Sequence, residues 1–80
     1  MEKDFNVLQE PENVQFSIAR TTKNPDILDS LANSPNSLVR MAAVENPTIS
    51  TETLTKKVDD EFVGVRWQAH EALEKRDVQV

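Results

Sequence analysis

A constant internal offset is the feature that most limits how this chain can fold. The pairs that share it are Val39-Arg40 with Val65-Arg66, Ala43 with Ala69, and Leu28 with Leu54. A weaker upstream copy has Glu10-Pro11 preceding Ser34-Pro35 by a slightly shorter interval. A fixed offset of this size is typical of stacked helical units that cannot bury their apolar faces alone. We therefore expect an all-α protein, with two full helical repeats and a degenerate first one in a single domain, residues 1–80.

Prolines and polar residues divide the chain into short helices. Residues 1–13, with Phe5 and Leu8 at helical spacing, form either an N-terminal cap or a frayed tail. The repeats occupy 14–76 and a short tail occupies 77–80. We expect helices over 14–23, over a short segment after Asp26, over 35–45 and over 51–58, followed by a longer last helix. The expected caps are Asp26, Ser34 with Pro35 as the first helical residue, Ser50, and Asp59 or Asp60.

Apolar residues recur at intervals of three and four, which indicates helices with one buried side. In the helix over 35–45, the predicted core residues are Leu38, Val39, Ala42 and Ala43. In the longer last helix, they are Phe62, Val65, Ala69, Ala72 and Leu73. The alanines allow neighbouring helices to approach closely. Ala19, in the degenerate unit, is expected to tolerate substitution better than Ala43 or Ala69.

Residues 24–73 also carry a motif of Asn-Pro, a leucine-containing helix, a small or acidic cap with Pro, and Val-Arg-x-Ala. The matching residues are Asn24-Pro25, Leu28, Leu31, Ala32, Ser34-Pro35, Val39-Arg40, Ala42-Ala43, Asn46-Pro47, Leu54, Val58, Asp60 and Val65-Arg66. This pattern resembles the leucine-rich variant repeat family, and short HEAT-like repeats share much of it. The resemblance implies a short right-handed α-solenoid, an αα-superhelix that serves as a binding scaffold. The cysteine-rich iron–sulfur segment of founding members has no counterpart, because this chain has no Cys.

Composition narrows the classes of function. Without Cys, the chain has no disulfide, no thiolate zinc site and no thiol nucleophile. Its 14 acidic and 9 basic residues give a net charge of −5, which argues against binding nucleic acid. No apolar run approaches the roughly 20 residues that span a bilayer. The polar start is unlike a secretory signal. We therefore expect a cytoplasmic protein with no membrane partner and no cofactor.

Arg40 and Arg66 occupy the same slot in the two full repeats. We favour a structural role, in which each guanidinium binds helix-terminal carbonyls or a cap carboxylate such as Asp60 or Asp29. The alternative is a row of arginines that binds an anionic ligand. The acidic cluster at 59–61 is interpreted as a helix cap rather than a cation site, because it lacks the alternating ligands and the glycine of a calcium loop.

Trp67 is the most informative residue for function. It falls nearly opposite the predicted core side of its helix, with Val63 beside it and His70 at the edge. Its counterpart in the preceding repeat, at the same offset, is Met41, with Val44 on the same outer side. These five residues predict an apolar, partner-binding patch, Trp67, Val63, Met41, Val44 and His70. The open alternative is that a neighbouring helix covers this side.

The sequence shows no group of residues arranged for catalysis, since its single histidine has no positioned nucleophile or acid partner. We therefore expect a non-enzymatic protein–protein interaction module, a small cytoplasmic adaptor or assembly protein, with a homodimer as one option. The alternative is an acidic inhibitor from a phage or mobile element that blocks a nucleic-acid-binding enzyme.

Overall fold

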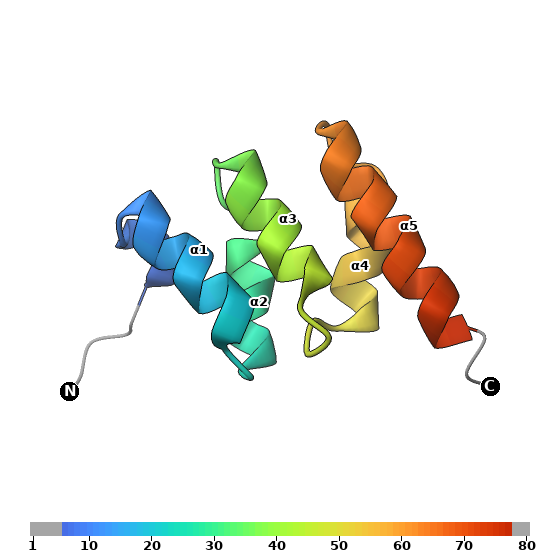
Figure 1. Cartoon of the computed structure of the whole chain (residues 1–80), viewed down its shortest axis with the longest axis horizontal. Coiled ribbons are helices and arrows are strands. Elements are labelled where there is room, and N and C mark those ends of the chain that lie inside the picture. Colours follow the sequence, from blue (N-terminus) through green and yellow to red (C-terminus); the bar gives the residue numbers. More distant parts are fainter. Residues whose placement is uncertain (1–5, 78–80) are drawn as a thin grey trace.

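The computed structural model describes residues 6–77, and over that range the chain is entirely helical, with no strand (Figure 1). The elements are the 3-10 helix η1 (Val7–Gln9) and the α-helices α1 (Glu12–Thr21), α2 (Pro25–Leu31), α3 (Ser37–Glu45), α4 (Thr51–Lys57) and α5 (Val63–Asp77). The predicted all-α class is confirmed for this part of the chain. Phe5, assigned to the N-terminal cap, and residues 78–80 of the tail lie outside the described residues. Asp77, assigned to that tail, belongs to α5.

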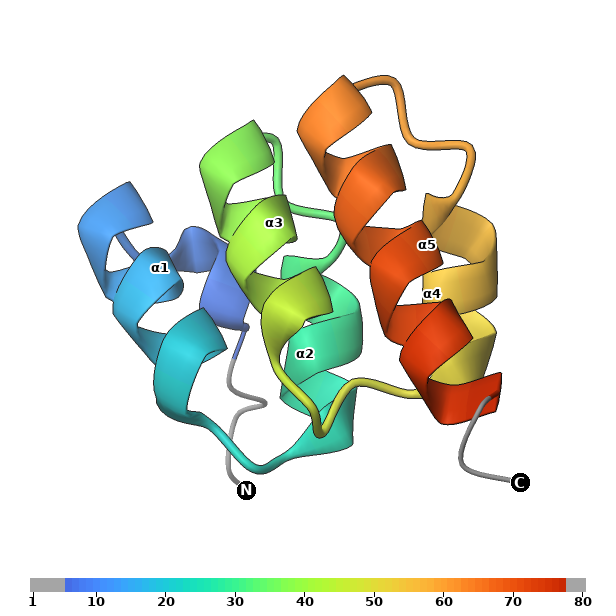
Figure 2. The ribbon, with the colours of Figure 1, turned by 45° about the vertical axis from the view of Figure 1, so that its right-hand side comes forward.

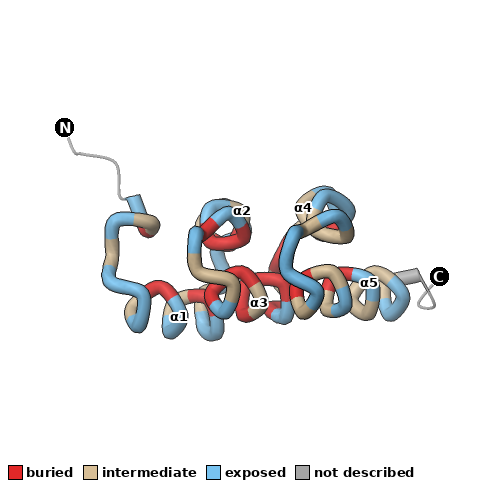
Figure 3. Tube along the Cα trace, turned by 90° about the horizontal axis from the view of Figure 1, so that it is seen from above, coloured by how far each residue is buried: buried red, intermediate tan, exposed pale blue. Residues whose placement is uncertain are grey.

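The helices form two layers. α1, α3 and α5 lie side by side and run in the same direction, while α2 and α4 return behind them (Figure 2). Seen from above, the buried segments lie between the two layers (Figure 3). α3 packs against α1 on one side and α5 on the other, and α4 packs against α5. The principal contacts of each helix are therefore with its neighbours along the chain or in its layer.

Small residues form part of the core that lies between the two layers (Figure 3). Ala19, Ala43 and Ala69 are completely buried, as are Leu28 and Leu54 beneath them in the second layer. A methyl side chain lets two helix backbones approach, while each buried leucine contributes about 2 kcal/mol by leaving water. Ala19 is as fully enclosed as the other two alanines, so its expected tolerance of substitution is not supported by its surroundings.

Asparagines, rather than the predicted residues, begin two of the helices. The side chain of Asn24 accepts the N–H groups of Asp26 and Ile27, and so caps α2 in place of Asp26. α3 begins at Ser37 and is capped by Asn36, two residues after the predicted cap. Asparagine caps a helix as well as serine or aspartate does, so residue type alone did not choose between neighbouring candidates. Ser50 caps α4 as predicted.

Two residues predicted to be in the core are exposed. Leu38 is 59% exposed, because α3 starts later than expected and Leu38 lies in its first turn. Phe62 precedes α5 instead of lying on it, and it is 37% exposed. The late helix starts leave both side chains near the edge of the first layer.

Candidate protein-binding surface

Arg40 and Arg66 make the same local contact in their two units. Nη1 of Arg40 donates to the carbonyl oxygen of Ser34 at 2.8 Å, and Nη1 of Arg66 donates to that of Asp60 at 2.8 Å. Each arginine therefore holds the loop that leads into its own helix. The two donors and the two acceptors are separated by the same interval, so the sequence offset corresponds to a structural one.

Arg40 also reaches the next unit. Its Nε and Nη2 atoms donate to the two carboxylate oxygens of Asp60 at 3.0 and 3.1 Å. Both side chains are nearly buried, with that of Asp60 only 5% exposed. This paired geometry is the strongest form of the arginine–carboxylate contact. The predicted contact between Arg40 and Asp60 is thus present, and it joins the start of α3 to the start of α5.

The environment of Asp60 favours its ionised form. Burial alone would raise the pKa of this carboxyl group. The N–H of Phe62 donates to it at 2.9 Å, and the hydrogen bonds and charge of Arg40 and the charge of Lys57 act in the same direction. These effects outweigh burial and hold the pKa of Asp60 below its ordinary value. The carboxylate therefore stays charged at neutral pH.

In α1, Gln15 binds the loop that precedes the helix, as Arg40 does in α3 and Arg66 does in α5. Its Nε2 atom donates to the carbonyl oxygens of Glu10 at 2.8 Å and Leu8 at 3.2 Å, while its Oε1 atom accepts from the hydroxyl of Ser34 at 2.9 Å. We call the set Gln15, Ser34, Arg40, Asp60 and Arg66 the polar ladder. Gln15 was not predicted from the sequence, because its spacing from Arg40 is one residue longer than the interval between the two proline motifs.

The predicted patch is divided by the packing of α5 on α3. Trp67 and Val63 are each 63% exposed, and His70 is also exposed. Met41 is half-buried, and its Sδ atom lies 2.8 Å from the place that a Cβ on Gly64 would occupy. Val44, on the same helix, is only 1% exposed.

The prediction that Val44 lies on an exposed side is therefore wrong. Val44 and Met41 hold on α3 the positions that His70 and Trp67 hold on α5, and α5 packs over that side of α3. Within residues 6–77, no further helix packs over the corresponding side of α5. The same helix position is thus covered on α3 and open on α5.

Exposed apolar side chains nevertheless extend across all three helices of the first layer. Phe16 on α1 lines a shallow hollow with Leu38, Leu38 lies one turn from Met41, and Met41 approaches Gly64 beside Phe62. We call this set the outer stripe: Phe16, Leu38, Met41, Phe62, Val63 and Trp67. Three of its members were not predicted to be exposed, and the late helix starts explain two of them. The guanidinium of Arg20 lies 5.6 Å from the Phe16 ring and covers that end.

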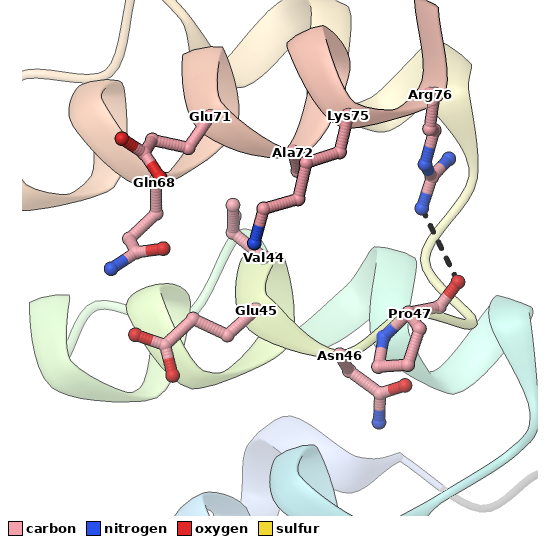
Figure 4. Close-up of a pocket in the computed structure, with 9 residues that line it drawn as sticks. All are labelled: Val44, Glu45, Asn46, Pro47, Gln68, Glu71, Ala72, Lys75 and Arg76. Carbon is pink, nitrogen blue, oxygen red and sulfur yellow. Dashed lines mark hydrogen bonds between the residues drawn. The ribbon is translucent and has the colours of Figure 1, made fainter. Parts of the chain in front are cut away.

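An open groove of about 600 Å³ lies between the C-terminal halves of α3 and α5 (Figure 4). Its polar groups include Glu45, Glu71 and Lys75, and Arg76 closes one end by donating to the carbonyl of Pro47 at 3.3 Å. Its other lining residues are Val44, Asn46, Gln68 and Ala72. None of them forms the hydrogen-bonded nucleophile and base that acyl or phosphoryl transfer requires. The groove is an open surface depression formed where α5 packs against α3.

Among residues 6–77, no group of three or more His, Asp or Glu side chains comes together in a way that could hold a metal ion. None of the helices described here has both the length and the apolar character needed to cross a membrane. Comparison of the chain with protein-family models, curated proteins and solved structures gives no match.

Proposed function

We propose that this chain is a short right-handed α-solenoid, with two full repeats and a degenerate first one, that acts as a non-catalytic protein-binding module in the cytoplasm. The repeated contact of Arg40 and Arg66 with the loops before their helices supports the repeat. The parallel order of α1, α3 and α5 supports the stacked arrangement. The motif resemblance to leucine-rich variant and HEAT-like repeats agrees with both.

The exposure of Trp67 carries the proposal of binding. An indole and an adjacent valine that are each 63% exposed, in one stripe with other apolar side chains, form the kind of surface that marks a protein interaction site. Tryptophan is enriched among the residues that dominate interface energies, and truncating such an anchor costs about 2 kcal/mol or more. Docking a partner on the outer stripe would remove this apolar surface from water.

The test is capture of partners on immobilised protein, with quantitative mass spectrometry of what binds. We expect the native chain to retain a partner that Trp67→Ala loses and that Glu52→Ala retains, since Glu52 is exposed on α4 away from the outer stripe. Circular dichroism should show equal helical content in all three proteins. Equal recovery of every captured protein by the native chain and by Trp67→Ala would refute the role of this surface.

Salt dependence separates this proposal from the alternative of an acidic inhibitor. Apolar docking on the outer stripe should persist at high ionic strength, because screening acts on charges and not on buried apolar area. A basic partner whose affinity falls steeply as salt increases, and whose binding Trp67→Ala does not change, would favour charge mimicry instead.

A further inference from the structure

The polar ladder has an unfilled position at its α5 end. Arg40 uses Nη1 for the loop before its own helix, and it uses Nε and Nη2 for the carboxylate of the next unit. Arg66 makes the first of these contacts through Nη1. Within residues 6–77, its Nε and Nη2 atoms meet no carboxylate. One half of the arginine clamp is therefore occupied and the other half is available.

The other end of the ladder carries an acidic residue at the equivalent position. The carbonyl of Glu10 accepts from Gln15, just as the carbonyls of Ser34 and Asp60 accept from Arg40 and Arg66. Glu10 therefore occupies the ladder position that Asp60 fills in the last unit. Its carboxylate forms no hydrogen bond or ion pair with any other described residue.

We propose that the α5 end of one chain binds the η1 and α1 end of a second copy, with Arg66 of one chain donating to Glu10 of the next as Arg40 donates to Asp60. This inference rests on the proposed function, because it uses the exposed side of α5 as the docking surface. In the complex, Trp67 and His70 of the first chain take the covered places that Met41 and Val44 hold inside the chain.

The chemistry of the ladder favours a second copy as the occupant. The internal junctions pair side chains of matching character: the Gln15 amide meets the hydroxyl of Ser34, and the guanidinium of Arg40 meets the carboxylate of Asp60. The remaining members at the two ends are a guanidinium and a carboxylate, which complement each other. A head-to-tail contact of this kind leaves one free end on each side, so it produces open chains of variable length rather than a closed dimer.

Charge reversal tests the proposed register. Sedimentation velocity of the native chain from micromolar to millimolar concentration should show association that increases progressively. Arg66→Glu and Glu10→Arg should each weaken it about tenfold or more, because each places like charges at the junction. An equimolar mixture of the two variants should associate again, since each variant then meets an opposite charge at both of its ends. Lys56→Glu, which makes the same charge change at an exposed site on α4, should leave association unchanged.

Glu10→Arg protects the test against a folding artefact, because only the backbone of Glu10 takes part in the described contacts, whereas Arg66 also supports its own loop. A native chain that stays monomeric at millimolar concentration would overturn the inference, and Trp67-dependent capture of another protein would show that the proposed function still stands. Association that Trp67→Ala abolishes but neither charge variant changes would likewise overturn the ladder register while keeping the docking surface.

Discussion

Arg40 and Arg66 share a sequence position, yet the structure predicts that their removal has unequal costs. Arg40→Ala deletes three charged hydrogen bonds and leaves the carboxylate of Asp60, only 5% exposed, with the N–H of Phe62 and the ammonium of Lys57 at 3.8 Å. Breaking a buried pair by removing one partner costs about 3–5 kcal/mol in general, and the remaining partners place this case near the lower end, at about 3 kcal/mol. Arg66→Ala deletes one described hydrogen bond and should cost about 1 kcal/mol.

A double-mutant cycle with Asp60→Ala isolates the contact. We expect a coupling energy of about 2 kcal/mol between Arg40 and Asp60, because their side chains bind directly. Arg66 and Asp60 provide the matched control. Arg66 binds the backbone carbonyl of Asp60, which alanine retains, so their coupling should stay below about 0.5 kcal/mol.

Urea unfolding followed by circular dichroism at neutral pH gives the four free energies of each cycle. A fixed concentration of sucrose should keep the weakest variants folded in the absence of urea, and equal m values are required before the energies are compared. Equal costs for Arg40→Ala and Arg66→Ala, or equal coupling of both arginines to Asp60, would refute the assignment of the interhelical contact to Arg40.

The remaining predictions concern packing, pH and the one glycine. Ala43→Leu and Ala19→Leu should each cost about 1–3 kcal/mol in urea unfolding, since both sites are completely buried. Because the pKa of Asp60 is lowered in the folded state, its stabilisation is present above the unfolded value of 3.8 and is lost as pH falls through the lower folded value. Asp60→Asn should therefore flatten the acid limb of the stability curve. Gly64→Ala should stabilise by less than about 1 kcal/mol, because the new Cβ displaces both the Met41 side chain and the Phe62 ring, and its effect should be larger in a Met41→Ala background.

The prolines, alanines and caps made most of the secondary structure predictable. The helix expected over 35–45 ends at Glu45 as α3, and Asn46 is its C-cap. Buried Ala43 and Ala69 were identified from their offset. The start of α3 was misplaced because Ser34 and Asn36 are both good caps, and only tertiary contacts decide between them. Ser34 instead binds Gln15 and the N–H of Asn36.

The candidate surface was predictable only in part, for a different reason. Helical periodicity shows which residues share one side of a single helix, but it does not show which side a neighbouring helix will cover. Val44 and His70 occupy equivalent positions, and the packing of α5 makes one buried and leaves the other exposed. Gln15 was missed because its spacing from Arg40 is one residue longer than the interval between the two proline motifs, and because an amide stands there in place of a guanidinium. The exposure of Trp67 was left open in the sequence and is now established for the chain as described.

The confinement of each helix to its neighbours has a consequence for communication along the molecule. Among the described residues, the longest hydrogen bond in sequence joins Arg76 to Pro47, 29 positions apart. α1 and α5 are linked through α3, which packs against both. A mechanical load or change of order at one end therefore reaches the other by two routes. One passes through the nine residues of α3, and the other passes through the second layer, where Thr53 of α4 donates to Asp29 of α2 at 2.6 Å. Softening α3 alone would weaken the coupling between the two ends, while the contacts of α2 with α4 would still connect them.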